Sequence, residues 1–370
     1  MMPRVSTFFF ASLILLLALG SCQRSQTNLP LAQPQWLRND QARGFRLGAQ
    51  GDDQFLLLLD PVSGDTLGRF QWGPGQYAQF RHLDAKSRIA SGSGVISGLF
   101  SALDLDTLIR AVDQRSYQPH GLMHREDLIQ FALGGNFNRQ ELLKAQPHLL
   151  VHYFFDNSQR EEIERLAPKV PVLWIQNYRE ASPLAKAEWI RAVGFLFGAY
   201  SQADSLYSLV KHNYQKLAQQ AKVPKPVFCN LPYAGNWTFP GQNAYLSTLI
   251  RDAGGTAIWP QESQSEVMVM GIEEAVGLWN SQPQLLWIHP GDCPDWDCMA
   301  DRVPRLMPLS RQTQLRVAQC DKGDLPGQVN RWYNEGSVRP DQLLSDLIHL
   351  TQDSLPQPDS LYFYRLIKQP

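Results

Sequence analysis

The chain has 370 residues, of which 44% are hydrophobic and 19% charged, so it is long enough for two ordinary domains or one large one with a full core. Its 34 basic and 35 acidic side chains give a formal net charge of −1, and it lacks the basic block that would indicate a nucleic-acid partner. After the N-terminal segment, no apolar run in the sequence is long enough to cross a bilayer.

The chain begins with a short basic region and an apolar run. Arg4 precedes an uncharged stretch at residues 5–19, whose length suits a signal peptide better than a transmembrane helix. The run closes with Leu19-Gly20-Ser21-Cys22, which resembles the lipobox of bacterial lipoproteins. That resemblance implies that residues 1–21 are removed and that Cys22 carries the lipid. An ordinary secretory signal is the alternative, which the lack of a following Ala-x-Ala-like site disfavours.

Residues 22–40 are predicted to be a tether, because their first part is rich in Gln, Pro, Ser and Asn. Residues 41–87 are predicted to form a small β-rich extension. Strand-like patterns occur at residues 44–47 and 54–60, and the second ends in the turn signal Asp60-Pro61-Val62-Ser63-Gly64-Asp65.

In residues 88–198, short apolar strands alternate with amphipathic helices, which predicts βα units and a largely parallel sheet. Strands are expected at residues 88–91, 106–112, 147–152 and 170–175, and helices at residues 95–102, 139–145 and 160–166. A helical pattern then extends from 184 to 221, broken only near residues 198–201, where Ser201 can cap a new helix. Its second half, residues 199–222, is predicted to be a connecting helix.

Residues 223–370 contain a second βα series. Strands are expected at residues 227–230 and 285–288, and helices at residues 245–253 and 273–280. The predicted fold class is therefore α/β, with two βα lobes that have mostly parallel central sheets and are joined by a single long α-helix. The β-rich extension precedes them.

Four cysteines follow Cys22, and in an oxidising compartment an even number permits disulfides. Cys293 and Cys298 flank only Pro-Asp-Trp-Asp, so a local bridge between them is the easiest closure. Pairings with Cys229 and Cys320 stay open, as do free thiols. A soft-metal site is the lesser alternative, because no second ligand pair with zinc spacing is evident.

The segment Gly92-Ser93-Gly94-Val95-Ile96-Ser97-Gly98 follows a strand and opens a helix, as a dinucleotide-binding fingerprint does. Asp113 lies at the end of the next strand-like run, where the fingerprint expects an acidic residue. The last glycine is displaced by one position, however. We interpret the segment as a structural turn whose amides can face a ligand.

His120 and His124, with Glu126 beside them, are weak candidates for a metal site. Pro119 and Gly121 predict a loop here, which would not hold both imidazoles on one helical face. The sequence contains neither a G-x-S-x-G nucleophile motif nor an H-E-x-x-H zinc motif. No catalytic residue, cofactor or metal is predicted.

Large aromatic side chains gather in Gly/Pro-rich segments of the second half. They can stack on a bulky ligand or pack over the ends of a sheet, and composition does not choose between these roles. They are Tyr233, Trp237, Phe239, Tyr245, Trp332 and Tyr333.

Five segments in order resemble the substrate-binding proteins of ABC importers for iron–siderophore complexes, haem and cobalamin. The most specific is Trp237-x-x-Pro240-Gly241-x-Asn243-x-Tyr245 with Asp252-Ala253-Gly254-Gly255. The others lie at residues 88–112, 138–151, 183–190 and 336–347. The resemblance covers the chain from about residue 88 to its end, and the extension resembles one found in a subgroup.

This resemblance implies a ligand in a cleft between two lobes, little hinge motion and a glutamate on each lobe that docks on the membrane permease. Glu273 or Glu274 matches in the second lobe. In the first lobe the matching position is Gln140, so Glu141 beside it is the candidate. His148 also replaces the usual aspartate after Pro147.

We therefore expect a monomeric, lipid-anchored substrate-binding protein in the cell envelope, facing the periplasm or the exterior. Its partners would be an ABC permease with its ATPase and a chelated-metal or tetrapyrrole ligand, with Arg331 opposing negative charge on that ligand. A metal-dependent hydrolase using His120, His124 and Glu126, and a non-transport binding lipoprotein, are the alternatives. The expected ligand-binding residues are Ser93, Tyr178, Trp237, Tyr245, Arg331, Trp332 and Tyr333.

Overall fold

The computed structural model describes residues 34–72, 83, 86–133, 136–166, 168–220, 224–260, 267–289, 291, 293–304, 315–324, 331–352 and 356–368. The predicted signal peptide, Cys22 and most of the predicted tether lie outside these residues. Within the described part of the chain, no helix combines the length and the apolar character needed to span a membrane.

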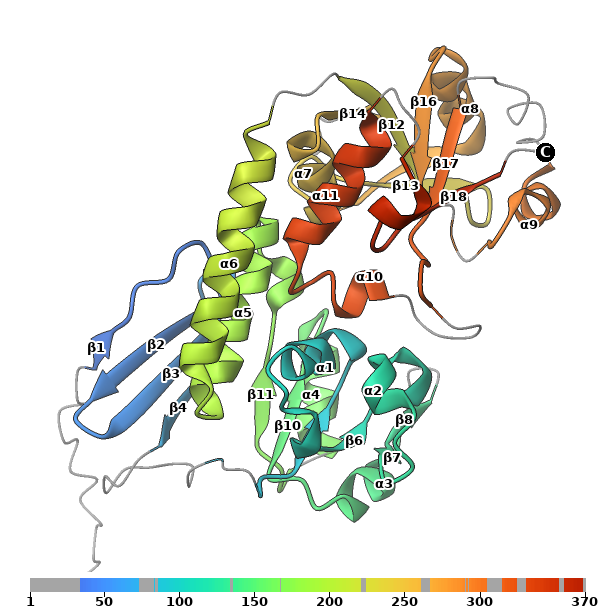
Figure 1. The fold of residues 1–370 in the computed structure, drawn as a ribbon. Helices are drawn as coiled ribbons and strands as arrows, with labels where there is room; N and C mark the ends of the chain where they lie inside the picture. Colours follow the sequence, from blue (N-terminus) through green and yellow to red (C-terminus); the bar gives the residue numbers. More distant parts are fainter. Residues whose placement is uncertain are drawn as a thin grey trace, which may run out of the picture. The chain divides into compact units, whose positions relative to one another are not determined.

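A four-stranded antiparallel sheet forms the N-terminal extension (Figure 1). Alternate side chains of its second and third strands are buried, as in a sheet with one face on a core. Phe45, for example, packs edge-on against Trp189, with 5.1 Å between the ring centroids. The predicted β-rich character is confirmed, but the first and last strands were not predicted, and the first, Gln35–Trp36, lies within the predicted tether. The strands are β1 (Gln35–Trp36), β2 (Phe45–Gln50), β3 (Asp53–Leu59) and β4 (Thr66–Trp72).

Two buried carboxylates hold the segment that leads into this sheet. Glu188 accepts hydrogen bonds from the backbone N–H groups of Asp40, Gln41 and Ala42 at 2.7–2.8 Å. Glu180 accepts from the backbone N–H of Gly44 at 2.9 Å and from that of Arg43 at 3.1 Å. Burial raises the pKa of Glu180, against the lowering effect of these hydrogen bonds. Such charge-assisted bonds fix the backbone of the segment whatever its side chains are.

The first lobe is built on a five-stranded sheet in the order β11-β10-β5-β6-β7, with every pairing parallel. This confirms the βα prediction. The predicted strand at residues 106–112 begins instead with a 3-10 turn, Asp106–Leu108. The loop expected around His120 is a short helix, α2 (His120–Met123). The strands are β5 (Ile89–Ser91), β6 (Ile109–Val112), β7 (Ile129–Gln130), β10 (Leu149–His152) and β11 (Val172–Trp174), and the helices include α1 (Gly94–Ser101), α3 (Arg139–Lys144) and α4 (Asn157–Leu166).

Two consecutive helices, α5 (Pro183–Leu196) and α6 (Tyr200–Ala218), lie side by side after the first lobe (Figure 1). The predicted interruption of the helical pattern is confirmed. It contains Gly198, whose φ of +73° suits glycine. Ser201 does not cap the second helix, however. That helix already begins at Tyr200, and Ser201 lies inside its first turn.

The second lobe has a sheet in the order β14-β12-β16-β17-β18, parallel except for the antiparallel edge strand β18. An antiparallel ribbon of β13 (Asn236–Pro240) and β15 (Val267–Gly271), which the sequence analysis missed, accompanies it. The sheet strands are β12 (Lys225–Cys229), β14 (Gly255–Ala257), β16 (Leu285–Ile288), β17 (Leu315–Gln319) and β18 (Arg365–Ile367), and the helices are α7 (Tyr245–Asp252), α8 (Ile272–Asn280), α9 (Trp296–Arg302), α10 (Arg331–Asn334) and α11 (Pro340–Thr351).

Cys293 and Cys298 form a disulfide, so the local bridge predicted from their spacing is confirmed. Cys229 and Cys320 are buried and take part in no disulfide in the part of the chain that the structure describes. Burial in apolar surroundings raises the pKa of the Cys229 thiol, which keeps it protonated and unreactive.

Candidate ligand-binding site

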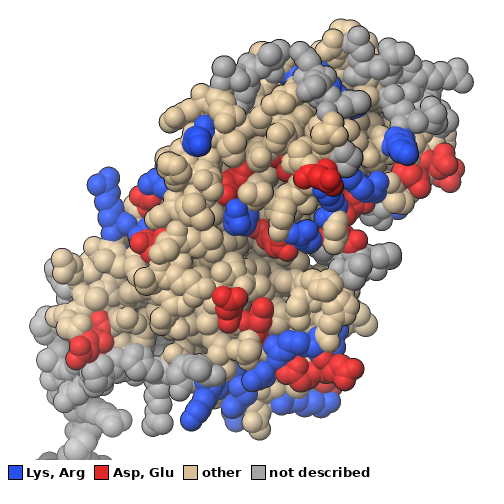
Figure 2. Space-filling model, viewed as in Figure 1, with Lys and Arg blue, Asp and Glu red and all other residues tan. Residues whose placement is uncertain are grey.

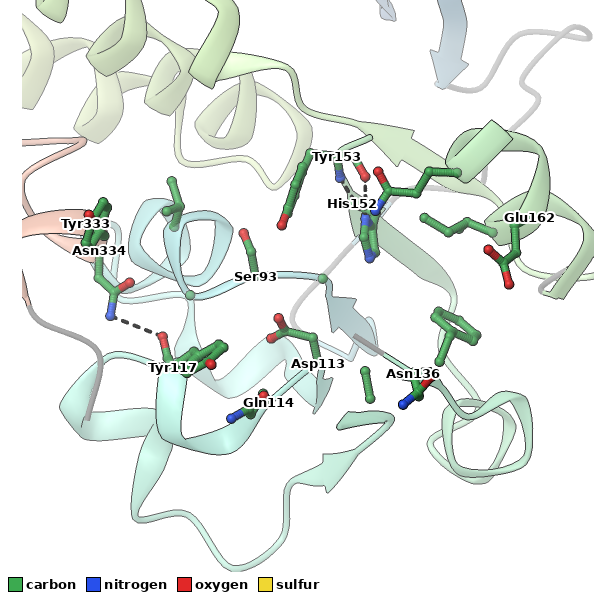
Figure 3. A pocket seen from close by; sticks show the side chains of 17 residues that line it. Ser93, Asp113, Gln114, Tyr117, Asn136, His152, Tyr153, Glu162, Tyr333 and Asn334 are labelled. Carbon is green, nitrogen blue, oxygen red and sulfur yellow. Dashed lines mark hydrogen bonds between the residues drawn. The ribbon is translucent and has the colours of Figure 1, made fainter. Parts of the chain in front are cut away.

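A cavity of about 710 Å³ lies at the carboxyl ends of the first lobe's parallel strands (Figure 3). Parallel strands all end at one edge of a sheet, which is where ligands of open α/β sheets bind. Ser93, Asp113 and Tyr153 each follow within two residues of a strand's end. The lining residues are Gly92, Ser93, Gly94, Val95, Asp113, Gln114, Tyr117, Ala132, Asn136, Phe137, His152, Tyr153, Gln159, Glu162, Ile163, Tyr333 and Asn334.

The glycines of the Gly92–Gly98 segment are needed for close packing around this cavity. A Cβ on Gly92 would overlap the imidazole of His152, and one on Gly94 would overlap the carbonyl group of Tyr117. The hydroxyl of Ser93 accepts a hydrogen bond from the backbone N–H of Ile96 at 3.1 Å, which caps α1. The segment is thus a structural turn at the edge of a cavity, as its spacing predicted.

The second lobe closes one side of the cavity through α10. Tyr333 and Asn334 of this helix are lining residues, and the Asn334 side-chain amide donates a hydrogen bond to the carbonyl oxygen of Tyr117 at 3.3 Å. A Cβ on Gly98 would overlap the carbonyl of Asn334, so α1 and α10 approach at backbone distance. The two lobes therefore contact each other directly at the cavity's rim.

His152 is the last residue of β10 and is only 8% exposed. Its Nδ1 lies 2.6 Å from the carbonyl oxygen of Tyr153. Burial lowers the pKa of His152 to about 4, although this hydrogen bond favours the protonated form. The imidazole is consequently neutral at neutral pH.

Asp113 follows β6 and accepts a hydrogen bond from the side-chain amide of Gln118 at 2.7 Å. Burial raises the pKa of Asp113 to about 6, against the lowering effect of its hydrogen bonds with Gln114 and Gln118. Burial also raises the pKa of Tyr153, and the negative charge of Asp113 adds to this effect. The carboxylate and the phenol therefore interact across the cavity, and Asp113 is ionised at neutral pH.

Of the residues expected to bind a ligand, the structure brings Ser93 and Tyr333 together in this cavity. Trp237 lies in the second lobe's hydrophobic core, fully buried, and its indole N–H donates to the carbonyl oxygen of Cys229 at 2.9 Å. Trp332 is also buried, edge-on to Tyr245, whose hydroxyl donates to the carbonyl oxygen of Gly336 at 3.1 Å. These three rings pack in or against the core of the second lobe. Trp237 lies there because β13 carries it on the buried face of the strand.

Arg331 and Tyr178 are not among the lining residues either. The Arg331 guanidinium makes two hydrogen bonds to Glu335, at 2.9 and 2.7 Å, and lies over the ring of Tyr362. The hydroxyl of Tyr178 donates to the carbonyl oxygen of Phe154 at 2.8 Å. Arg331 is therefore paired with Glu335 just beyond its helix and does not line the cavity.

Sequence reasoning missed Tyr117, Asn136, His152 and Tyr153, and it considered Asp113 only as part of a dinucleotide motif. His152 and Tyr153 had a usable signal, since they close the predicted strand at residues 147–152 on the side where α/β sheets bind ligands. Tyr117 ends a 3-10 helix, Arg115–Tyr117, and Asn136 begins the strand β9 (Asn136–Phe137); both elements are too short for a periodic pattern to mark them.

The metal alternative finds little support in the geometry. The rings of His120 and His124 do lie close, with centroids 4.6 Å apart, but both residues are exposed. Among the described residues, no group of three or more His, Cys, Asp or Glu side chains is placed to hold a metal ion.

The expected docking glutamates lie on the surface. Glu274 is exposed in the first turn of α8, as is Glu273 before it. Glu141 lies in the first turn of α3, where the ammonium group of Lys144 is 2.6 Å from its carboxylate. Figure 2 shows acidic and basic side chains intermingled along the lower edge of the first lobe.

A sequence model described as "Periplasmic binding protein" matches residues 89–297, more than half of the chain. This chain belongs to the periplasmic binding protein family. The resemblance to substrate-binding proteins of ABC importers is therefore confirmed. No curated protein matches the sequence.

Solved structures share the fold of this periplasmic binding protein. A periplasmic haem-binding protein from Pseudomonas aeruginosa aligns with a TM-score of 0.56 and 15% identity, covering 76% of this chain and 98% of its own. The vitamin B12 binding protein BtuF of Vibrio cholerae aligns with a TM-score of 0.52 and 14% identity, covering 73% of this chain and 98% of its own. An Fe3+-hydroxamate transport protein from Saccharomonospora viridis aligns with a TM-score of 0.51 and 16% identity, covering 73% of this chain and 94% of its own. The predicted two-lobed α/β fold is confirmed.

Proposed function

We propose that this protein is the lipid-anchored substrate-binding component of an ABC importer and captures an iron–siderophore, haem or cobalamin-type ligand. The cavity between the first lobe's strand ends and α10 carries this proposal, because both lobes supply its lining. Its volume of about 710 Å³ is in the range of sites that bury a small organic ligand. Proteins of the same fold are described as binding haem and vitamin B12, and one as an Fe3+-hydroxamate transport system.

The ligand test is native purification followed by mass spectrometry of what the protein carries. Isothermal titration with a ferric hydroxamate, haem and cyanocobalamin then measures each affinity. We expect at least one ligand to bind with a Kd in the micromolar range or below, as capture from dilute solution requires. Binding no tighter than millimolar for all of them would refute the proposal.

The proposed anchor is Cys22, whose lipidation would keep the protein beside its permease. In cells, wild-type protein should sediment with membranes, and the Cys22→Ser variant should lose this association and the mass of the lipid. A Cys229→Ser variant is the matched control, because it makes the same substitution at a buried cysteine far along the sequence from the signal segment. Equal membrane association of all three proteins would contradict the anchor.

The proposed docking groups are Glu141 on α3 and Glu273 or Glu274 on α8. Glu141→Gln and a Glu273→Gln/Glu274→Gln double variant should each lower ligand-stimulated ATPase activity of the cognate transporter several-fold while leaving ligand affinity unchanged. Glu161→Gln on α4 is the control. If only the α8 variant lowers the activity, Glu141 does not replace the first-lobe glutamate.

The rival readings have weaker support. A hydrolase would need His120, His124 and Glu126 to hold a metal, and all three are exposed outside the cavity. A binding lipoprotein without a transporter would bind the ligand but leave the ATPase activity of every associated permease unchanged.

A further inference from the structure

The charged groups that line the cavity are acidic. Asp113 and Glu162 supply carboxylates, and no lysine or arginine occurs among the described lining residues. Two nearby guanidinium groups are engaged elsewhere. Arg115 donates to the carbonyl oxygens of Arg125 and Leu128, and Arg331 pairs with Glu335. The described charged side chains that line the cavity are therefore carboxylates.

The imidazole of His152 adds no positive charge to the cavity that it lines. Its Nδ1 lies 2.6 Å from the carbonyl oxygen of Tyr153 and 2.9 Å from the backbone nitrogen of the same residue. These two contacts suit different tautomers, so Nε2 is an acceptor in one and a donor in the other, and the ring is neutral in both. Because burial lowers the pKa of His152 to about 4, the ring is neutral at neutral pH.

Aromatic side chains line the same cavity. Tyr117, Phe137 and Tyr153 line the cavity from the first lobe, and Tyr333 lines it from α10. Figure 3 shows the Asp113 side chain in the middle of the labelled groups, with Ser93 and Tyr117 on one side and His152 on the other. Carboxylates combined with the faces of aromatic rings bind organic cations.

We infer that the cavity takes a cationic ligand, a metal chelate or other compound that presents a protonated amine to Asp113 beside the rings of Tyr117, Tyr153 and Tyr333. The inference rests on the proposed function and specifies the charge of its ligand. It also reverses the expectation that Arg331 opposes negative charge on the ligand. Anionic chelates and haem, which carries two carboxylates, would be repelled.

The test uses one iron chelate in three charge states. Ferrioxamine B carries a protonated amine, its N-acetyl derivative is neutral, and its N-succinyl derivative is anionic. Isothermal titration of the full chain at pH 7.5 and low salt should give affinities in the order cationic, neutral, anionic. A unit charge a few ångströms from a carboxylate in a partly buried site corresponds to about tenfold in affinity per step.

Two variants test which carboxylates cause the preference for the cationic chelate. Asp113→Asn keeps the acceptor oxygen for Gln118 and should reduce the cationic-to-neutral preference about tenfold, while the affinity for the neutral derivative stays the same. Glu162→Gln, on the exposed face of α4, should reduce it by a smaller factor. Glu161→Gln is the matched control, because it removes the same charge from the same helix outside the cavity and should leave the preference intact.

The outcomes separate this inference from the function it rests on. Binding of all three chelates with equal affinity, or tighter binding of the succinyl derivative or of haem, would overturn the cationic ligand while leaving the transport function in place. A charge order that survives both Asp113→Asn and Glu162→Gln would also overturn it. No binding of any chelate, of haem or of cyanocobalamin would overturn both.

Discussion

The two lobes place a histidine at the same point of their sheets and use it differently. His152 ends β10 in the first lobe, and His289 directly follows β16 in the second. Both are buried, and burial lowers the pKa of His152 to about 4 and that of His289 to about 3. The Nε2 of His289 is hydrogen-bonded to the Tyr364 hydroxyl, however, and its ring packs against Trp332. His152 instead lines the cavity.

The two histidines differ in their hydrogen-bond partners, since His289 contacts a side chain of its own lobe and His152 contacts the backbone of Tyr153. In the second lobe, the Tyr364 hydroxyl that contacts His289 also accepts a hydrogen bond from the indole N–H of Trp332 at 3.1 Å, so these described groups satisfy one another. The first lobe keeps glycines at Gly92 and Gly94, where a side chain would fill the space beside His152. The cavity therefore depends on glycine at these two positions, because a larger side chain would occupy the space beside His152 and Tyr117.

Among the variants that test this contrast, Trp237→Ala should cause the largest loss of unfolding free energy. The Trp237 ring is fully buried and packs edge-on against Phe228, with 4.8 Å between the centroids. Its removal should cost about 3–5 kcal/mol of unfolding free energy, measured by urea denaturation. A cost below about 1 kcal/mol, or a selective loss of ligand affinity in a stable protein, would place this ring in a binding site instead.

The next effect concerns the contact between the lobes. Gly98→Ala should cost about 1–3 kcal/mol, because its Cβ would overlap the Asn334 backbone and push α1 from α10. It should also weaken ligand binding, since α10 closes the cavity. Gly121→Ala is the control, because its Cβ would meet no atom within 4 Å. Equal stability of both variants in urea would contradict the close packing of α1 on α10.

The smallest effect is a pH dependence from Asp113. Its pKa is raised from 3.8 to about 6 on folding, so the stability that its bound proton contributes is complete below pH 3.8 and is lost as pH rises through about 6. We expect wild type to lose about 1 kcal/mol relative to Asp113→Asn between pH 4 and pH 8, after screening by solvent. Parallel stability profiles of the two proteins would show that Asp113 has an ordinary pKa in the folded state.

Much of the fold could be predicted because buried parallel strands are short apolar runs. Residues 285–288 form β16 with the predicted bounds, and all four side chains are buried. The ribbon of β13 and β15 was harder to recognise. Yet Asn236-Trp237-Thr238-Phe239 alternates exposed and buried side chains, the period of two that marks a strand. Reading this alternation would have placed Trp237 in the core.

The site could be predicted less well, because its residues are defined by contacts between distant segments. Tyr333 and Asn334 meet Tyr117 only after α10 is brought against the first lobe. Arg331 looked suited to an anionic ligand, but its partner Glu335 lies one helical turn away, a spacing that itself predicts an ion pair. The residue type of Arg331 alone therefore did not show whether its guanidinium would contact a ligand or pair with a neighbouring carboxylate.

The carboxylates of Glu180 and Glu188 have a mechanical consequence. They hold the chain at Asp40, Gln41, Ala42, Arg43 and Gly44 through backbone N–H groups alone. A pull on the chain ahead of β1 would first separate this two-residue strand from β2. The load would then fall on several short hydrogen bonds to α5 and the segment before it, so these bonds would resist extraction of the chain beyond Asp40.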